Sequence, residues 1–393
     1  MEQWPPDGRR STLVALTGGN FAQFGVRLLL GAVVPLVLTD LGTTKSRIGL
    51  ALTGMWAVYA LFQFPSGILA DRFGERPLLL VGLSGTVVGA ALVSITPSIR
   101  LYGIFVVVLG AGAGLFYSPA SALISRLYQE HGGALGMLTA SGAVAGVVYP
   151  IGGSYLAARF GWRFSVAVGA AVALPALLMT LGLVSSLPPA NSSRSLRDAV
   201  DVQQIRELLS RPSVAYTTII AIITAFTFQA IGSFFPTFLV EFRGVEPSLA
   251  GVGFGAVFGI SAIAQPVAGL VSDYVSRDFA IGSSVTLTGL AFLILIFVPS
   301  NLGLVAGTAL LGVGVSWPGT TQARFMDQLD DAERGYGFGL VRTVYMFVGA
   351  SGSVVVGTLA EQFGWPVSYG AVVALLSVCV LLLASNRIFG LDL

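Results

Sequence analysis

Residues 12–38 have the sequence TLVALTGGNFAQFGVRLLLGAVVPLVL, in which Arg27 is the one charged residue. A helix rises about 1.5 Å per residue, so about 20 apolar residues cross the roughly 30 Å hydrocarbon core of a bilayer. The stretch is too long for the apolar part of a signal peptide, and no small-residue cleavage site follows it. We therefore expect it to remain in the protein as the first transmembrane helix.

Eleven further apolar runs follow along the chain. They cover residues 47–69, 77–97, 101–125, 133–158, 164–187, 213–240, 249–272, 279–299, 301–323, 337–360 and 366–386. The sequence therefore predicts an all-α membrane protein with twelve transmembrane helices. We expect an N-terminal six-helix bundle (residues 1–187), a cytoplasmic linker (188–212) with a short amphipathic helix over residues 196–209, and a C-terminal six-helix bundle (213–393).

The composition excludes other classes of protein. Apolar residues make up 54% of the chain, and 21 basic plus 19 acidic residues make up only 10% of it. Soluble domains usually carry about 25% charged residues, so this chain cannot cover a water-facing surface of its size. A net charge of +2 gives no reason to expect nucleic acid binding, and the single Cys379 and single His131 argue against a disulfide, a metal or a haem. We expect no cofactor and no enzymatic activity.

The distribution of basic residues predicts the orientation in the membrane. With the N-terminus inside, thirteen Lys and Arg residues lie on the cytoplasmic side and six outside, while Arg27 and Arg342 lie within runs. Cytoplasmic loops carry the excess of basic residues in membrane proteins. We therefore expect both termini in the cytoplasm and the protein in the cell membrane. We expect a monomer, whose partners are the lipid bilayer and a small-molecule substrate.

The two groups of six runs repeat each other. A shift of 202 residues aligns Gln63 with Gln265, and a shift of 203 aligns the Phe-Gly-Trp triplet of residues 160–162 with that of residues 363–365. Duplicated bundles of this kind are typical of secondary transporters, which hold their substrate near the membrane midplane between the halves. A channel or a scaffold does not need two matched halves.

The sequence GILADRFGER at residues 67–76 resembles the loop signature of the major facilitator superfamily, and GLVSD at residues 269–273 is its counterpart in the second half. The resemblance implies two pseudo-symmetric six-helix bundles and alternating access. It also implies a cytoplasmic gating motif at Gly67, Asp71, Arg72, Gly74, Arg76, Arg126, Gly269 and Asp273. From its chemistry, Asp71 can accept hydrogen bonds from a helix N-terminus or from Arg126.

Arg27 is the main candidate for a functional residue. A charged side chain at the bilayer centre costs about 2.5 to 3.5 kcal/mol on insertion scales, so it needs a compensating role. Helical spacing places Arg27 on one face with Asn20 and Gln23, and the shift of 202 puts Gln229 opposite it. No Asp or Glu lies deep in a run, which leaves an anionic substrate as the partner. The alternative is that Arg27 binds backbone carbonyls and serves packing.

A second resemblance supports the anion. Arg27 stands eight residues before Pro35, and the segment of residues 48–67 is similar to helix 2 of the organic-anion branch of the superfamily. The match implies that Arg27 is an anion clamp, although Val26 stands where that branch often has Asp. Further candidates for the cavity are Gln322, Arg342, Tyr345 and two aromatic residues just before a proline, Tyr117 and Trp317. Arg342 could line the cavity or snorkel to the cytoplasm.

We therefore expect a transporter of a small organic or inorganic anion that works by uniport, exchange or symport with a proton carried on the substrate. The alternative is an exporter of hydrophobic or cationic compounds. Residues 142–153 resemble the Gly-Pro stretch of antiporters of the superfamily, with Ile151 alone between Pro150 and Gly152. Drug antiporters usually carry Arg four residues before the Gly in the fourth helix, whereas Val106 precedes Gly110 here. A third class, a sensor or scaffold without transport, does not explain a duplicated polar cavity.

Overall fold

The computed structural model describes residues 6–128, 130–189, 202–330, 334–391 and 393. These residues form helices and no strands. The helices are α1 (Pro6–Asp40), α2 (Lys45–Phe73), α3 (Glu75–Ser94), α4 (Ile99–Gly114), α5 (Tyr117–Leu127), α6 (Gly132–Phe160), α7 (Trp162–Leu183), α9 (Val202–Ser210), α10 (Pro212–Glu241), α11 (Pro247–Tyr274), α12 (Arg277–Phe297), α13 (Asn301–Gly314), α14 (Trp317–Gln328), α15 (Arg334–Gly349), α16 (Ser351–Phe363) and α17 (Trp365–Phe389).

The prediction of twelve transmembrane helices is confirmed. Within the described residues, twelve helical segments are long and apolar enough to cross a membrane. Three of them consist of two helices each, which are α4 with α5, α13 with α14, and α15 with α16. Of the amphipathic helix expected in the linker, the second part is present as α9, and residues 190–201 lie outside the described part of the chain.

The breaks within two of these segments were not predicted. Leu115 and Phe116 separate α4 from α5, and Val315 and Ser316 separate α13 from α14. Pro318 lies in the first turn of α14, where its missing N–H costs no helical hydrogen bond. Because each break falls just before Tyr117 or Trp317, it sets the position of that aromatic residue at the start of a new helix.

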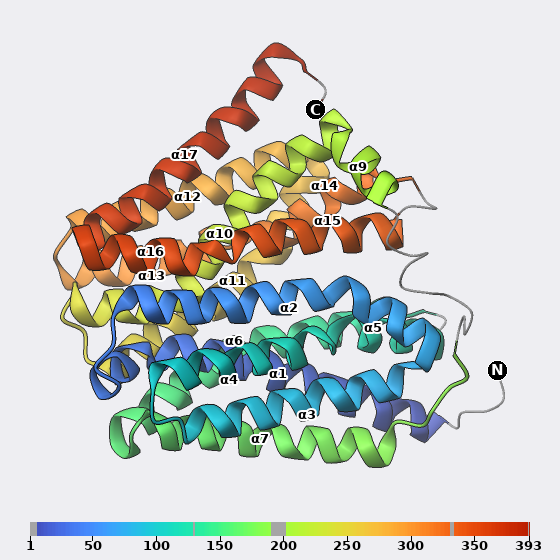
Figure 1. Cartoon of the computed structure of the whole chain (residues 1–393). Helices are drawn as coiled ribbons and strands as arrows, with labels where there is room; N and C mark the ends of the chain where they lie inside the picture. Colours follow the sequence, from blue (N-terminus) through green and yellow to red (C-terminus); the bar gives the residue numbers. More distant parts are fainter. Residues whose placement is uncertain (1–5, 129, 190–201, 331–333, 392) are drawn as a thin grey trace.

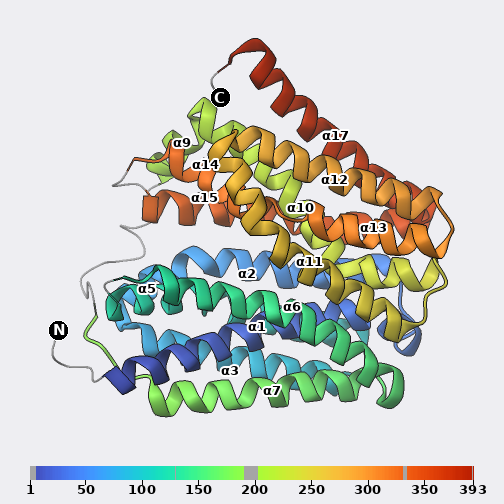
Figure 2. The same cartoon turned by 180° about the vertical axis from the view of Figure 1, so that it is seen from behind.

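The helices form two groups. Figure 1 shows α1 to α7 in one group and α10 to α17 in the other, with α2 of the first group beside α15 and α16 of the second. The view from behind in Figure 2 shows α6 of the first group beside α11 of the second. The start of α1 and the end of α17 lie at one end of the molecule, which we call the terminus end. The loops after α1 and α10 lie at the opposite end, which we call the far end.

The repeated Phe-Gly-Trp triplet makes the same local structure in both halves. Gly161 and Gly364 have φ angles of 85° and 83°, values that favour glycine, and each ends one helix and begins the next. The indole of Trp162 donates to Asp40 over 3.2 Å, and the indole of Trp365 donates to Glu241 over 3.0 Å. In each half, the triplet therefore ties the last helix to the end of the first helix.

Contacts between the two halves close the far end. Lys45 pairs with Glu241 at 2.9 Å, and the Ser46 hydroxyl donates to Glu361 over 2.6 Å. The backbones also approach closely. A Cβ atom added to Gly31 would lie 1.9 Å from the carbonyl oxygen of Gly232, and one added to Gly251 would lie 2.7 Å from that of Pro150. Helices can come this close only where one side lacks a side chain.

The loop signature of residues 67–76, at the terminus end, makes a contact that the sequence did not predict. The guanidinium of Arg126 donates to Glu75 over 2.6 Å and to the carbonyl of Pro188 over 2.8 Å, and Asp71 is not among these acceptors. Glu75 lies in the first turn of α3, where a carboxylate is stabilised by the helix dipole, and it is 3% exposed. The second half repeats the pair, because Arg324 binds Asp278 in the first turn of α12.

Other residues of this signature and of its counterpart have local roles. Gly74, with a φ angle of 87°, ends α2 and begins α3. Arg76 donates to the carbonyl of Leu181 over 2.8 Å and so ties the start of α3 to the end of α7. Asp273 pairs with Arg277 across the turn between α11 and α12.

Candidate functional site

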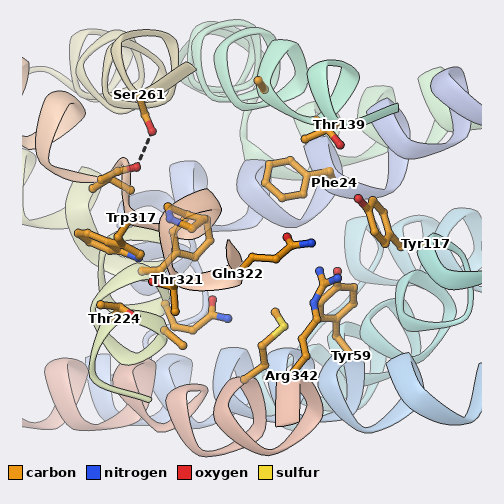
Figure 3. A pocket seen from close by; sticks show the side chains of 18 of the residues that line it. Phe24, Tyr59, Tyr117, Thr139, Thr224, Ser261, Trp317, Thr321, Gln322 and Arg342 are labelled. Carbon is orange, nitrogen blue, oxygen red and sulfur yellow. Dashed lines mark hydrogen bonds between the residues drawn. The ribbon is translucent and has the colours of Figure 1, made fainter. Parts of the chain in front are cut away.

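A cavity of about 330 Å³ lies between the two halves. It is lined by α1, α2, α5 and α6 of the first half and by α10, α11, α14 and α15 of the second. The structure brings all nine predicted substrate residues to this one cavity, namely Asn20, Gln23, Arg27, Tyr117, Gln229, Trp317, Gln322, Arg342 and Tyr345. Figure 3 shows Gln322, Tyr117 and Arg342 pointing into the same space. Their role in binding remains a prediction.

Arg27 lies near the middle of α1 and is 1% exposed. Its Nε donates to the Gln23 carbonyl over 3.1 Å, and its Nη2 donates to Gln23 Oε1 over 2.7 Å. The Gln23 amide donates to Asn20 over 2.8 Å, and Asn20 in turn donates to the carbonyl of Leu138 in α6 over 2.7 Å. This chain of hydrogen bonds fixes the guanidinium but leaves its Nη1 buried and without a partner.

Aromatic rings surround the same guanidinium. Its central carbon lies 3.9 Å from the ring centre of Tyr59, 4.9 Å from that of Trp56 and 5.3 Å from that of Phe24. The faces of these rings attract a cation, which partly replaces the water that burial removes. The sequence analysis missed Trp56 and Tyr59. Their spacing of three, continued four residues later by Gln63, was the available signal for a polar face on α2.

Arg342 of α15 provides a second cation from the other half. It lines the cavity, and its guanidinium carbon lies 5.2 Å from the ring centre of Tyr117. Of the two placements left open by the sequence, the structure therefore shows the cavity. Tyr345, three residues later, lines the same space and stacks on Phe325 with ring centres 6.0 Å apart.

Among the described residues that line the cavity, no carboxylate balances the positive charges. Two guanidinium groups line it, and none of its described lining residues is Asp or Glu. The described part of the chain also holds no cluster of His, Cys, Asp or Glu that could bind a metal ion. Two cations in a medium of low dielectric constant repel each other and have lost hydration, so an anion between them is favoured.

The remaining wall is mostly apolar. Phe228 and Phe258 meet edge to face with ring centres 5.9 Å apart, and Trp317 and Met346 continue this wall. The hydroxyl of Thr224 donates to the carbonyl of Ile220, and that of Ser261 donates to Val315 over 2.6 Å (Figure 3). These two hydroxyl protons are therefore already used within the protein.

A twelve-helix membrane protein with a cavity between two similar halves belongs to the class of secondary transporters. The sequence profile of the Major Facilitator Superfamily matches residues 16–263 and 218–387. The chain belongs to this superfamily of transporters, as the loop signature predicted.

Relatives and solved structures agree with this assignment. The chain is 24% identical to the nitrite extrusion protein of Bacillus subtilis (strain 168) over 65% of this chain and 63% of that protein. It is 28% identical to a multidrug resistance protein B homolog of Mycobacterium tuberculosis (strain CDC 1551 / Oshkosh) over 44% of this chain and 35% of that protein. The chain thus spans less than two thirds of either relative. A bacterial homolog of the human lysosomal transporter Spinster, in an inward-facing and unoccupied conformation, has the same fold, with a TM-score of 0.84, 16% identity and 99% coverage of both chains.

Proposed function

We propose that this protein is a secondary transporter of a small anion and that Arg27 is the principal ligand of that anion. The observation that carries the proposal is the buried guanidinium of Arg27, which keeps Nη1 without a partner in a cavity whose described lining has no carboxylate. Arg342 provides further positive charge from the opposite half. Arginine binds carboxylates and other oxyanions well because its donors lie in one plane. The name of the nitrite extrusion relative is consistent with an anion.

The arrangement also supports alternating access. Arg27 belongs to the first half and Arg342 to the second, so an anion held by both contacts both halves. In this structure the far end is closed by Lys45 with Glu241 and by the glycine contacts. An anion can leave toward the far end only after these contacts separate. Bound anion reduces the repulsion between the two cations and thereby favours the closed intermediates of the cycle.

The test of this proposal is the thermal stability of the purified protein with different ions. A ligand that binds the folded state raises the melting temperature. We expect sodium salts of benzoate, phosphate or nitrite to raise it in comparison with sodium chloride, and we expect ethidium or tetraphenylphosphonium to leave it unchanged. Stabilisation by the organic cations alone would favour the alternative, which is an exporter of hydrophobic or cationic compounds. The aromatic wall of the cavity and the multidrug relative support this alternative.

We further propose exchange as the mode of transport. The cavity offers two cations and, among its described lining residues, no carboxylate that could carry a proton. Returning empty would require two uncompensated cations to pass through a closed state, at a cost in desolvation. Proteoliposomes should therefore take up the best-binding labelled anion of that panel faster when loaded with the same unlabelled anion, at equal pH on both sides. Uptake that requires a pH gradient and ignores the internal anion would contradict exchange.

From the distribution of basic residues, we propose that both termini are cytoplasmic. We also propose that the protein lies in the cell membrane and acts as a monomer. His131 is exposed between α5 and α6 at the terminus end, and Asn301 is exposed at the start of α13 at the far end. In intact cells, an impermeant maleimide should label Asn301→Cys and not His131→Cys. Permeabilised cells should show both. The native Cys379 is buried, so the parent protein serves as the unlabelled control. If only His131→Cys were labelled in intact cells, the protein would have the opposite orientation.

A further inference from the structure

Three side chains in the cavity wall have a buried polar atom without a hydrogen-bond partner, which are Arg27 at Nη1, Gln229 at Oε1 and Thr321 at Oγ1. The residues are 1%, 1% and 5% exposed. Buried polar groups in native proteins are almost always paired, so each exception needs an explanation. All three residues line one cavity, so a ligand bound there is one source of the missing partners.

The unpaired atom of Arg27 needs a hydrogen-bond acceptor, whereas the unpaired atom of Gln229 needs a donor. A guanidinium nitrogen can only donate, whereas the oxygen of an amide can only accept. A ligand that satisfies both therefore carries an anionic oxygen for Arg27 and an N–H or O–H group for Gln229. Nitrite and similar ions without hydrogen satisfy the first requirement and leave Oε1 of Gln229 unpaired.

The remaining lining residues indicate the size and the polarity of the rest of the ligand. Phe24, Phe228 and Phe258 line it together with Trp317 and Met346. The nearby hydroxyls of Thr224 and Ser261 donate to backbone carbonyls, so this side offers mainly apolar contact. The volume of about 330 Å³ lies at the small end of ligand pockets. A compact aromatic or otherwise apolar group fits such a wall better than a long lipid chain or a hydrated inorganic ion.

We propose that the substrate is a compact organic anion with an apolar ring and a hydrogen-bond donor. Its anionic group binds Arg27, its ring lies on the wall of Phe228, Phe258 and Trp317, and its hydroxyl or amino group donates to Gln229. This inference rests on the proposed function, because it takes the bound species to be an anion and then names its chemical class.

The test compares dissociation constants of four probes, measured by titration calorimetry on the purified full chain. The probes are 4-hydroxybenzoate, benzoate, nitrite and the uncharged 4-hydroxybenzamide. One additional hydrogen bond contributes about 1 kcal/mol, so 4-hydroxybenzoate should bind roughly fivefold more tightly than benzoate. Burial of the ring should make benzoate at least about tenfold tighter than nitrite. The uncharged amide should bind at least about tenfold more weakly than 4-hydroxybenzoate.

A pair of variants isolates the role of Gln229. Gln229→Leu should bind 4-hydroxybenzoate no better than it binds benzoate. Gln265→Leu is the matched control, because Gln265 lines the same cavity but already donates to Ser261 over 3.2 Å. This control should keep the roughly fivefold preference. If the melting temperature shows that Gln229→Leu does not fold, Gln229→Met provides the same comparison.

The outcomes separate the two levels of the proposal. Nitrite that binds as tightly as benzoate would refute the aromatic anion and leave anion transport intact. An equal preference for 4-hydroxybenzoate in Gln229→Leu and Gln265→Leu would refute the donor to Gln229. Failure of all three anions to bind, together with binding of an organic cation such as ethidium, would refute the proposed function itself.

Discussion

Arg27→Ala is expected to lower the affinity for benzoate or any other bound anion by about 30-fold or more. Loss of one partner from a buried, hydrogen-bonded charge pair costs at least about 2 kcal/mol, and each 1.4 kcal/mol is a factor of ten. Gln23 and Asn20 hold the guanidinium of Arg27 in place, and the second cation, Arg342, belongs to the opposite half. Titration calorimetry on the purified protein gives the affinity. Arg27→Lys should recover only part of it, because an ammonium lacks the planar pair of donors.

The stability of the ligand-free protein separates binding from packing. If Arg27 serves a substrate, its removal relieves an uncompensated buried cation, and the melting temperature without ligand should stay the same or rise. If Arg27 serves packing, the melting temperature should fall. Arg100→Ala is the matched control, since Arg100 is exposed at the start of α4 and outside the cavity. Equal binding by Arg27→Ala, Arg100→Ala and the parent would refute the anion clamp.

The sequence predicted those features of the site that follow from the energetic cost of placing polar groups in lipid. Apolar runs of sufficient length predict helices because unpaired backbone groups are not tolerated in lipid. A charged residue in such a run indicates a cavity because it cannot face lipid. Both arguments depend on residues within one helix, and they placed Arg27, Gln23 and Asn20 correctly on a common face. The internal repeat then related Gln229 to Arg27 across the two halves, and the structure places both in one cavity.

Arguments from single helices could not predict which residues of different helices contact one another. Trp56 and Tyr59 are aromatic residues in an apolar helix, which resembles ordinary core packing until the position of Arg27 is known. The loop that Arg126 was expected to contact holds two acidic residues, Asp71 and Glu75. Only the end of α2 at Gly74 decides that Glu75 is the one that binds Arg126. For Arg342, the sequence left two placements open because the residue lies about five positions inside its apolar run, close enough to the end of the run for its side chain to snorkel.

The glycines at the far end are a further example, and they allow a prediction about the transport cycle. Gly31 faces the backbone of the opposite half, and a Cβ atom there would lie 1.9 Å from the carbonyl oxygen of Gly232. An ordinary contact needs about 3.4 Å, so the two backbones would have to separate by about 1.5 Å (3.4 minus 1.9). Packed interfaces do not stretch continuously, and they switch between discrete arrangements. Gly31→Ala should therefore disfavour the state in which the far end is closed.

We expect Gly31→Ala to reduce anion transport strongly while leaving the protein folded. Overpacking costs about 1–3 kcal/mol, which is a shift of roughly 5- to 150-fold in the equilibrium between the two states. Spin labels at Arg47→Cys in the first half and Glu246→Cys in the second, both exposed at the far end, report the separation of the halves. Pulsed electron paramagnetic resonance should show a longer distance in Gly31→Ala than in the parent. Gly152→Ala is the matched control, because an added Cβ there meets no atom within 4 Å. Identical distances and transport rates in the two alanine variants would show that the Gly31 contact does not hold the far end closed.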